Sequence, residues 1–108
     1  MGAATIARHG IALPMEPIAA FCLRHHVRRL ALFGSILRAD FRPDSDIDVL
    51  VEFEPGQAPG WEFFAMQDEL AGMLGRRVDL NTPGFLSRSF RDEVQAGALT
   101  LYEADRSR

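Results

Sequence analysis

Three segments of the chain carry side chains at the i, i+3, i+4 spacing of an amphipathic helix. The first runs from about Met15 to Arg28 and follows Pro14, a residue that a first helical turn tolerates. The second ends at Gly75, where a left-handed helix cap is expected, and the third closes near Gly97. The positions on this spacing are Ile18, Phe21, Cys22 and His25, then Phe63, Met66, Leu70, Met73 and Leu74, then Leu86, Phe90 and Val94. We therefore predict three helices.

Four short segments have the composition of strands. Residues 30–33 form an apolar run that stops at Gly34, and residues 46–53 alternate carboxylate and aliphatic side chains before becoming continuously apolar. The β-branched residues of the second segment favour an extended chain. Two further strands are predicted at 78–80 and 99–102, and the proline- and glycine-rich residues 54–60 are predicted to form a surface loop. Strands that alternate with helices predict an α/β fold.

Length and composition indicate a small globular protein. A chain of 108 residues is the size of one domain, so we predict a single domain over 1–108 without a second substrate domain. No stretch approaches the roughly 18 apolar residues of a membrane span, and the N-terminus lacks the pattern of a signal peptide, so a cytoplasmic location is expected. Cys22 has no internal disulfide partner and is predicted to lie in the core.

The charged residues exclude some chemistry. A net charge of -3 argues against non-specific nucleic-acid binding over the whole surface, because that affinity comes from neutralising many phosphates. All 12 basic residues are arginine, which rules out lysine-dependent chemistry such as a Schiff base or a Walker-type phosphate loop. Any bound phosphate must therefore meet arginine or backbone N–H groups.

Asp46 and Asp48 are candidates for metal binding. They lie two residues apart on a predicted strand, so both carboxylates face the same side. Like charges at that spacing raise each other's pKa, and a divalent cation bound between them removes this cost. Magnesium, a hard and oxygen-seeking ion, fits best.

Asp79 is a third candidate, on the short strand 78–80. Its neighbours Val78 and Leu80 make an apolar setting in which an unpaired carboxylate is costly. If this strand lies beside that of Asp46 and Asp48, the three carboxylates can hold one or two metal ions, an arrangement that stabilises the attacking and leaving oxygens in phosphoryl transfer. Taken alone, Asp79 is as often a strand-end cap or a member of an ion pair.

A phosphate site is predicted at Gly34 and Ser35, in the turn between the first strand and a short helix. Free backbone N–H groups and the helix dipole attract phosphate there, and Gly34 lets the backbone come close. The Ser35 hydroxyl can add a hydrogen bond, and Arg38, one helical turn further, can place a guanidinium on the same phosphates. A Gly-Ser pair alone is an ordinary turn, but combined with Asp46 and Asp48 it predicts a triphosphate cradle.

The aspartates also have non-catalytic interpretations. Asp44, Asp46 and Asp48 match the first three ligand positions of an EF-hand calcium loop. Val49 in place of glycine at position six and Pro55 in place of glutamate at position twelve argue against that loop. Hydration of an exposed strand end is the other alternative.

Three further groups of side chains are predicted to have structural roles. Aromatic residues at the start of the second helix are expected in the core. Basic residues near the end of the first helix are expected to complement its dipole, and two later arginine groups are expected on solvated faces. These groups are Trp61, Phe63 and Phe64; His25, His26, Arg28 and Arg29; and Arg76, Arg77, Arg88 and Arg91.

The segment from Leu32 to Phe53, LFGSILRADFRPDSDIDVLVEF, resembles the signature of the DNA polymerase beta-like nucleotidyltransferase superfamily. That pattern is Gly-Ser, a spacer and Asp-x-Asp. Here Gly34-Ser35 is followed by ten residues and then Asp46-Ile47-Asp48, a spacer within the range typical of the superfamily. The short length and the Gly-Ser-x-x-Arg start also look like the minimal nucleotidyltransferases, which pair with HEPN-domain toxins in bacterial and archaeal toxin–antitoxin modules.

This resemblance spans nearly the whole chain and implies a polymerase beta-like nucleotidyltransferase fold, with a small mixed sheet and flanking helices. It implies transfer of AMP from ATP to a tyrosine of a cognate HEPN toxin, with magnesium as the cofactor. Asp79 would be the third carboxylate and the base. The implied nucleotide-binding residues are Gly34, Ser35, Arg38 and Ser45, and the implied metal ligands are Asp46, Asp48 and Asp79.

Three functions are therefore compared. The first is a magnesium-dependent protein adenylyltransferase that acts as an antitoxin, and it requires all three aspartates. The second is a non-catalytic antitoxin that only covers the toxin's active site, in which case Asp48→Asn leaves neutralisation intact. The third is nucleotide transfer to a small molecule such as an aminoglycoside, which resembling enzymes perform with an additional domain. Without such a domain, a homodimer or a partner protein is expected to complete the site, and neither membrane nor direct nucleic-acid binding is expected.

Overall fold

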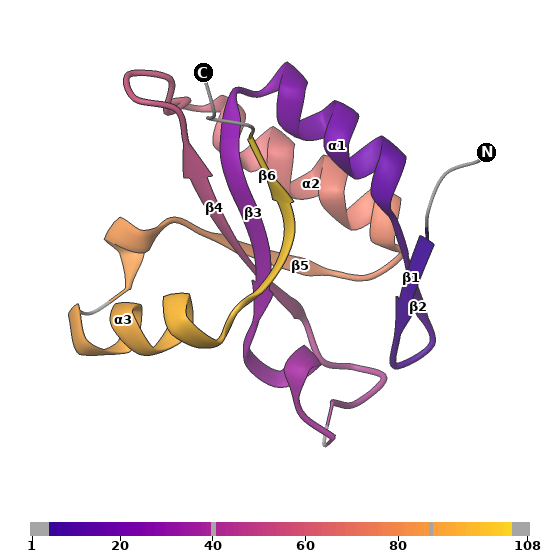
Figure 1. The fold of residues 1–108 in the computed structure, drawn as a ribbon. Coiled ribbons are helices and arrows are strands. Elements are labelled where there is room, and N and C mark those ends of the chain that lie inside the picture. Colours follow the sequence, from indigo (N-terminus) through magenta and orange to yellow (C-terminus); the bar gives the residue numbers. More distant parts are fainter. Residues whose placement is uncertain (1–4, 40, 87, 105–108) are drawn as a thin grey trace.

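Four strands form one mixed sheet in the order β5-β4-β3-β6 (Figure 1). The computed structural model describes residues 5–39, 41–86 and 88–104. Strand β3 (Val27–Phe33) pairs antiparallel with both β4 (Ile47–Phe53) and β6 (Leu99–Glu103), whereas β4 and β5 (Val78–Asn81) run parallel. The predicted α/β class with a small mixed sheet is confirmed.

Helices cover both faces of this sheet. Figure 1 shows α1 (Met15–Arg24) and α2 (Glu62–Leu74) side by side on one face and α3 (Arg88–Gly97) on the other. Two single 3₁₀ turns, η1 (Gly34–Leu37) and η2 (Pro83–Phe85), follow β3 and β5. No helix in the described part of the chain is long and apolar enough to cross a membrane.

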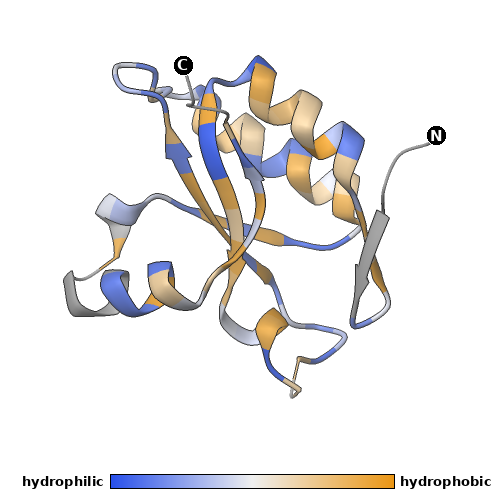
Figure 2. Cartoon of the chain, in the orientation of Figure 1, coloured by the Kyte–Doolittle hydropathy of each residue, from blue (hydrophilic) through white to orange (hydrophobic). Residues whose placement is uncertain are grey.

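Two hydrophobic clusters result from the alternation of side chains along the strands. The larger lies between the sheet and the first two helices, and Figure 2 shows apolar residues gathered along these elements. Its buried members include Ile18, Phe21 and Cys22 of α1, Leu30 and Leu32 of β3, Ile47, Val49 and Val51 of β4, and Met66, Leu70 and Leu74 of α2. The smaller contains Phe33, Leu50 and Val94 beneath α3. The predicted core position of Cys22 is confirmed.

A hairpin precedes α1 that the sequence pattern did not predict. Strands β1 (Thr5–Arg8) and β2 (Ile11–Pro14) pair antiparallel across a turn at His9 and Gly10, where φ is 53° and 78°. Positive φ at both turn residues is the geometry that matches the twist of a tight hairpin. The hairpin places Ile11 and Leu13 in the larger core.

Helix α1 is shorter than predicted, and β3 begins earlier. The helix ends at Arg24, and His26 takes a left-handed conformation with φ of 58° before the strand starts. Arg28 and Arg29 therefore lie on β3, so the prediction that they complement a helix dipole is wrong. His25 remains at the helix end, where its Nε2 lies 3.1 Å from Oε1 of Glu69 on α2.

The prediction for the aromatic residues near the start of α2 is correct for one of three. Phe63 is half-buried and packs against the larger core, but Trp61 is 89% exposed and Phe64 is 61% exposed. The buried positions of α2 are Met66, Leu70 and Leu74, and Trp61 and Phe64 lie off this face. Arg88, Phe90 and Arg91 lie on α3, but their side chains are outside the described part of the structure.

Replacing two aromatic residues should separate core from surface. Phe21 is fully buried, so Phe21→Ala should lower the free energy of unfolding by about 3–5 kcal/mol. Trp61→Ala removes an exposed side chain and should change it by less than about 0.5 kcal/mol. Urea unfolding followed by circular dichroism measures both, and a large loss for Trp61→Ala would contradict the exposed position.

Candidate active site

The parallel pairing of β4 with β5 brings two of the predicted carboxylates together. Asp48 on β4 is the direct Cα partner of Asp79 on β5, so the predicted adjacency of the two strands is confirmed. The outer edge of β5 is held by α2, because the backbone N–H of Leu80 donates to Oε1 of Gln67 at 2.9 Å. Asp79 is exposed, and its carbonyl accepts a hydrogen bond from Nδ2 of Asn81 at 3.1 Å. The strand that carries Asp79 is thus held along both edges.

Gly34 lies against Asp48 from the other side. In the β3–β4 pairing Phe33 is the Cα partner of Asp48, so the residue after β3 is placed beside the aspartate. Gly34 has φ of 79°, and a Cβ atom added to it would overlap Oδ2 of Asp48. Both the left-handed backbone and the missing side chain are therefore needed at this position. The Gly-Ser motif and the Asp-x-Asp motif meet at this contact.

The carboxyl group of Asp48 has a raised pKa. Its pKa is raised from 3.8 to about 6, first by burial and then by the negative charges of Asp79 and Asp46, while the guanidinium of Arg38 acts in the opposite direction. In the absence of a cation, Asp48 is therefore protonated in a fraction of the molecules near neutral pH. A positively charged ligand at this point would be stabilised by the same field.

Asp46 is paired with an arginine, which the sequence analysis did not predict. Its Oδ1 lies 3.0 Å from Nε of Arg77, whose Nη2 also donates to the carbonyl of Asp44 at 3.4 Å. The backbone carbonyl of Arg77 accepts the N–H of Ile47 at 2.9 Å, which places the arginine next to the start of β4. Arg77 is exposed, as predicted, but it belongs to the site.

Arg76 holds the loop that leads to Asp46. Its Nη2 donates to the carbonyls of Arg42 at 3.0 Å and Ser45 at 2.5 Å, and its guanidinium lies 4.9 Å from the centre of the Phe41 ring. It is half-buried, so its predicted place on a solvated face is wrong. The signal that could have revealed both arginines is their place directly before the strand of Asp79.

The other predicted nucleotide-binding residues take different positions. Arg38 follows η1 with an extended backbone, and its N–H donates to the carbonyl of Ser35, so it lies one 3₁₀ turn beyond Ser35, as predicted. Because η1 is a single 3₁₀ turn, a helix dipole contributes little to this cradle. Ser45 uses its hydroxyl oxygen to accept the N–H of Arg42 at 3.1 Å, within the loop before Asp46. Binding of a nucleotide by Ser35, Arg38 and Ser45 stays a prediction.

The three carboxylates suit magnesium in chemistry but have not converged. They are oxygen donors, and the raised pKa of Asp48 shows that their charges act on one another. Among the described residues, no group of three or more histidine, cysteine or acidic side chains is arranged to hold a metal ion. Asp46 points to Arg77, so a metal ion held by all three aspartates requires this side chain to move. The donor set fits, and the metal-ligand assignment stays a prediction.

A cavity of about 330 Å³ opens beside Gly34. Its walls come from Phe33, Gly34 and Arg38 on one side and from Glu93 and Val94 of α3 on the other. Helix α3 thereby borders the predicted phosphate site, which its sequence did not indicate. The cavity offers apolar walls with an arginine and a glutamate.

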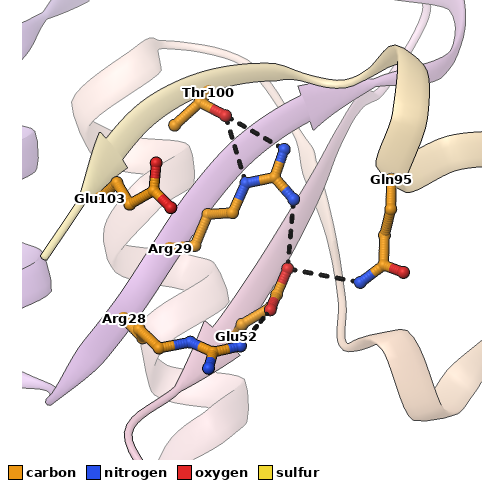
Figure 3. A pocket seen from close by; sticks show the side chains of 6 residues that line it. All are labelled: Arg28, Arg29, Glu52, Gln95, Thr100 and Glu103. Atoms are coloured by element: carbon orange, nitrogen blue, oxygen red, sulfur yellow. Dashed lines mark hydrogen bonds and ion pairs between the residues drawn. The ribbon is translucent and has the colours of Figure 1, made fainter. Parts of the chain in front are cut away.

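A second, larger cavity of about 480 Å³ lies at the far end of the same sheet face (Figure 3). Glu52 is at its centre and is contacted by Nη2 of Arg28 at 2.6 Å, Nη1 of Arg29 at 3.2 Å and Nε2 of Gln95 at 3.4 Å. Arg29 also donates to the hydroxyl of Thr100 at 3.1 Å and 3.0 Å. These contacts tie α3 and β6 to β3 and β4, and thus fix the helix that borders the first cavity.

Residues 16–99 match the sequence profile of a family described as Nucleotidyltransferase domain. Among curated proteins, the chain is 41% identical over 58 residues to a protein adenylyltransferase, MntA, of Thermococcus cleftensis. This match covers 53% of the chain and 57% of the relative, which is less than two thirds of the relative's length.

Two solved structures have similar folds. One, assigned as a minimal nucleotidyltransferase, has 35% sequence identity and a TM-score of 0.67, with 79% of this chain and 86% of that chain covered. The other is a crystal structure of a toxin-antitoxin with AMP-PNP, at 21% identity and a TM-score of 0.68, with 87% of this chain and 77% of that chain covered. At this lower identity the second comparison supports the fold alone.

Substitution of Gly34 should test its contact with Asp48. Gly34→Ala should cost about 1–2 kcal/mol of unfolding free energy for the left-handed backbone, and more because Asp48 must move. Gly56→Ala is the matched control, since Gly56 has a similar φ of 77° but nothing within 4 Å of an added Cβ. Urea unfolding followed by circular dichroism measures both, and equal losses would contradict the close contact.

Asp48→Asn should stabilise the fold at alkaline pH. The folded-state pKa of Asp48, about 6, lies above its ordinary value of 3.8, so its favourable contribution is complete below pH 3.8 and is lost as pH rises through 6. Asparagine does not carry the ionised group, so the variant should melt roughly 2–5 °C above wild type at pH 8. The difference should vanish near pH 4.

Thermal melts at several pH values measure this difference, with Asp68→Asn as the control. Asp68 is an exposed carboxylate on α2, and its replacement should leave the melting temperature unchanged at every pH. A constant difference between Asp48→Asn and wild type across the pH range would show that the pKa of Asp48 is not raised.

Proposed function

We infer the activity from the family: the chain belongs to the nucleotidyltransferase domain family, and we propose that it transfers AMP from ATP to a hydroxyl of a partner protein. The observation that carries the proposal is the contact at Gly34. The Gly34 backbone lies close to the Asp48 side chain, and Asp79 on the neighbouring strand β5 is the direct Cα partner of Asp48. These contacts support the proposal that the turn at Gly34 binds phosphate beside two carboxylates.

In the proposed reaction, the hydroxyl oxygen of the acceptor attacks the α-phosphorus of ATP. The bond from that phosphorus to the bridging oxygen breaks, pyrophosphate leaves, and AMP becomes attached to the acceptor. Asp79 takes the hydroxyl proton, for which its exposed carboxylate is suited. The backbone at Gly34 and Ser35 binds the triphosphate and Arg38 adds positive charge beside it.

Asp46, Asp48 and Asp79 would hold one or two magnesium ions. When bound, magnesium neutralises the charge of the triphosphate and favours departure of pyrophosphate. The role of the chain is to supply the oxygen ligands and to orient them. The mixed sheet does this by fixing Asp48 opposite Asp79 and beside Gly34.

A HEPN-family toxin is the proposed acceptor, and its tyrosine hydroxyl the proposed target. The relative named as a protein adenylyltransferase supports a protein acceptor, and the resemblance to minimal nucleotidyltransferases implies the toxin and its tyrosine. With the toxin as acceptor, the complex is a hetero-oligomer, the donor is cellular ATP and the expected location is the cytoplasm. A homodimer remains the alternative assembly.

The proposal predicts a nucleotide mass on the partner. The protein, magnesium and each nucleoside triphosphate in turn are incubated with the HEPN-family protein encoded beside it, and the partner is weighed by mass spectrometry. Wild type should add the mass of AMP from ATP, and Asp48→Asn should lower the rate at least about 100-fold, since the charge beside the phosphates is lost. Asp68→Asn keeps the same change of charge away from the site and should retain full activity.

Other outcomes identify the alternatives. Binding and neutralisation of the partner with no added mass would contradict transfer and identify a non-catalytic antitoxin. A different added mass would identify another nucleotide as the donor.

A further inference from the structure

Arg77 contacts the predicted metal ligand Asp46 at the atom that a cation would need. Its Nε lies 3.0 Å from Oδ1 of Asp46, and Nη2 donates to the carbonyl of Asp44. The backbone carbonyl of Arg77 accepts the N–H of Ile47, so the arginine is fixed next to the residue after Asp46. The chain before β5 thus pairs with the start of β4. This pairing places the charge of Arg77 beside the Asp46 carboxylate.

The neighbouring Arg76 has a different contact set, which separates the two arginines by role. Arg76 donates to the carbonyls of Arg42 and Ser45 and lies over Phe41, and all of these partners belong to the loop before Asp46. In the described contacts, the side chain of Arg77 bonds instead to the carboxylate of Asp46 and the carbonyl of Asp44. It meets a carboxylate whose other expected ligand is a metal ion.

The ion pair between Arg77 and Asp46 is weak enough to open. The side chains of Arg77 and Asp46 are 78% and 48% exposed, and ion pairs at such exposure are weak because water competes for both partners. A divalent cation and a guanidinium repel each other, so a cation bound at the Asp46 carboxylate weakens its ion pair with Arg77. Asp48 and Asp79 add negative charge nearby, which favours the more highly charged ion.

We propose that Arg77 is an internal counter-ion that occupies Asp46 in the metal-free protein and must release it before a divalent cation binds. The inference rests on the proposed function, because that function makes Asp46 a metal ligand. Arg77 is thus a positioning residue: it holds the Asp46 carboxylate in an ion pair, and its departure frees Asp46 to bind a cation together with Asp48 and Asp79.

Metal affinity tests this exchange. Mn²⁺ is titrated into the full chain without nucleotide, and binding is followed by the loss of the free ion's electron paramagnetic resonance signal. Arg77→Gln removes the competitor, so Mn²⁺ should bind about 1.5- to 5-fold more tightly than to wild type, the range expected for an exposed ion pair. Arg24→Gln removes the same charge from a pair with Glu69 on the helices, and should leave the affinity unchanged.

A second measurement follows Arg77 directly. In ¹H–¹⁵N spectra, the Nε–H signal of Arg77 in wild type should move when Mg²⁺ is added, towards the position that it has in Asp46→Asn without metal. Such a movement shows that the Arg77–Asp46 ion pair has opened. A loss of charge elsewhere in the protein would not move this signal in that direction. The matched Nε–H signal of Arg24 should stay in place.

Three results would overturn the inference: unchanged or weaker Mn²⁺ binding by Arg77→Gln, no Mn²⁺ binding by wild type, or an Arg77 signal that does not move when Mg²⁺ binds. The proposed function is tested separately, because neither measurement needs a nucleotide or an acceptor. AMP transfer together with a fixed Arg77 signal would overturn the exchange alone. A moving signal without any transfer would support the exchange and overturn the proposed activity.

Discussion

The parallel pairing of β4 with β5 is the contact on which the site depends. It sets Asp48 opposite Asp79, and a shift by one residue would turn one of these side chains to the other face of the sheet. The fold resists such a shift because Ile47 and Val49, on either side of Asp48, are buried beneath α1 and α2. Hydrophobic packing on one face thus holds like charges together on the other.

The fold also brings together opposite charges that lie far apart in the sequence. Between Arg42 and Arg76 the sequence contains acidic residues and no basic residue, so counter-charges must come from elsewhere in the chain. The sheet and helices bring them together: Glu69 meets Arg24, Glu52 meets Arg28 and Arg29, and Asp46 meets Arg77. At Asp48, the charge of Arg38 opposes the charges of Asp79 and Asp46.

Sequence patterns predicted the parts of this arrangement that depend on local spacing. Period-two alternation identified β4, helical spacing identified α2, and the motif pairing Gly34 with Asp48 singled out two residues that the fold brings into contact. The place of Arg77 before the strand of Asp79 was visible in the sequence, but its contact with Asp46 was not, because that contact depends on the pairing of segments that are distant in sequence. The end of α1 was missed because His25 continues the helical spacing, although the chain turns at His26 to begin β3.

The exposure of Trp61 determines what tryptophan fluorescence can measure in this protein. It is the single tryptophan of the chain, and its indole is already surrounded by water in the folded state. Its emission should therefore change little when the protein unfolds, and tryptophan fluorescence would give a poor record of stability. The same property makes it a sensitive native probe for association, because any molecule that covers the start of α2 would move the emission of Trp61 to shorter wavelength.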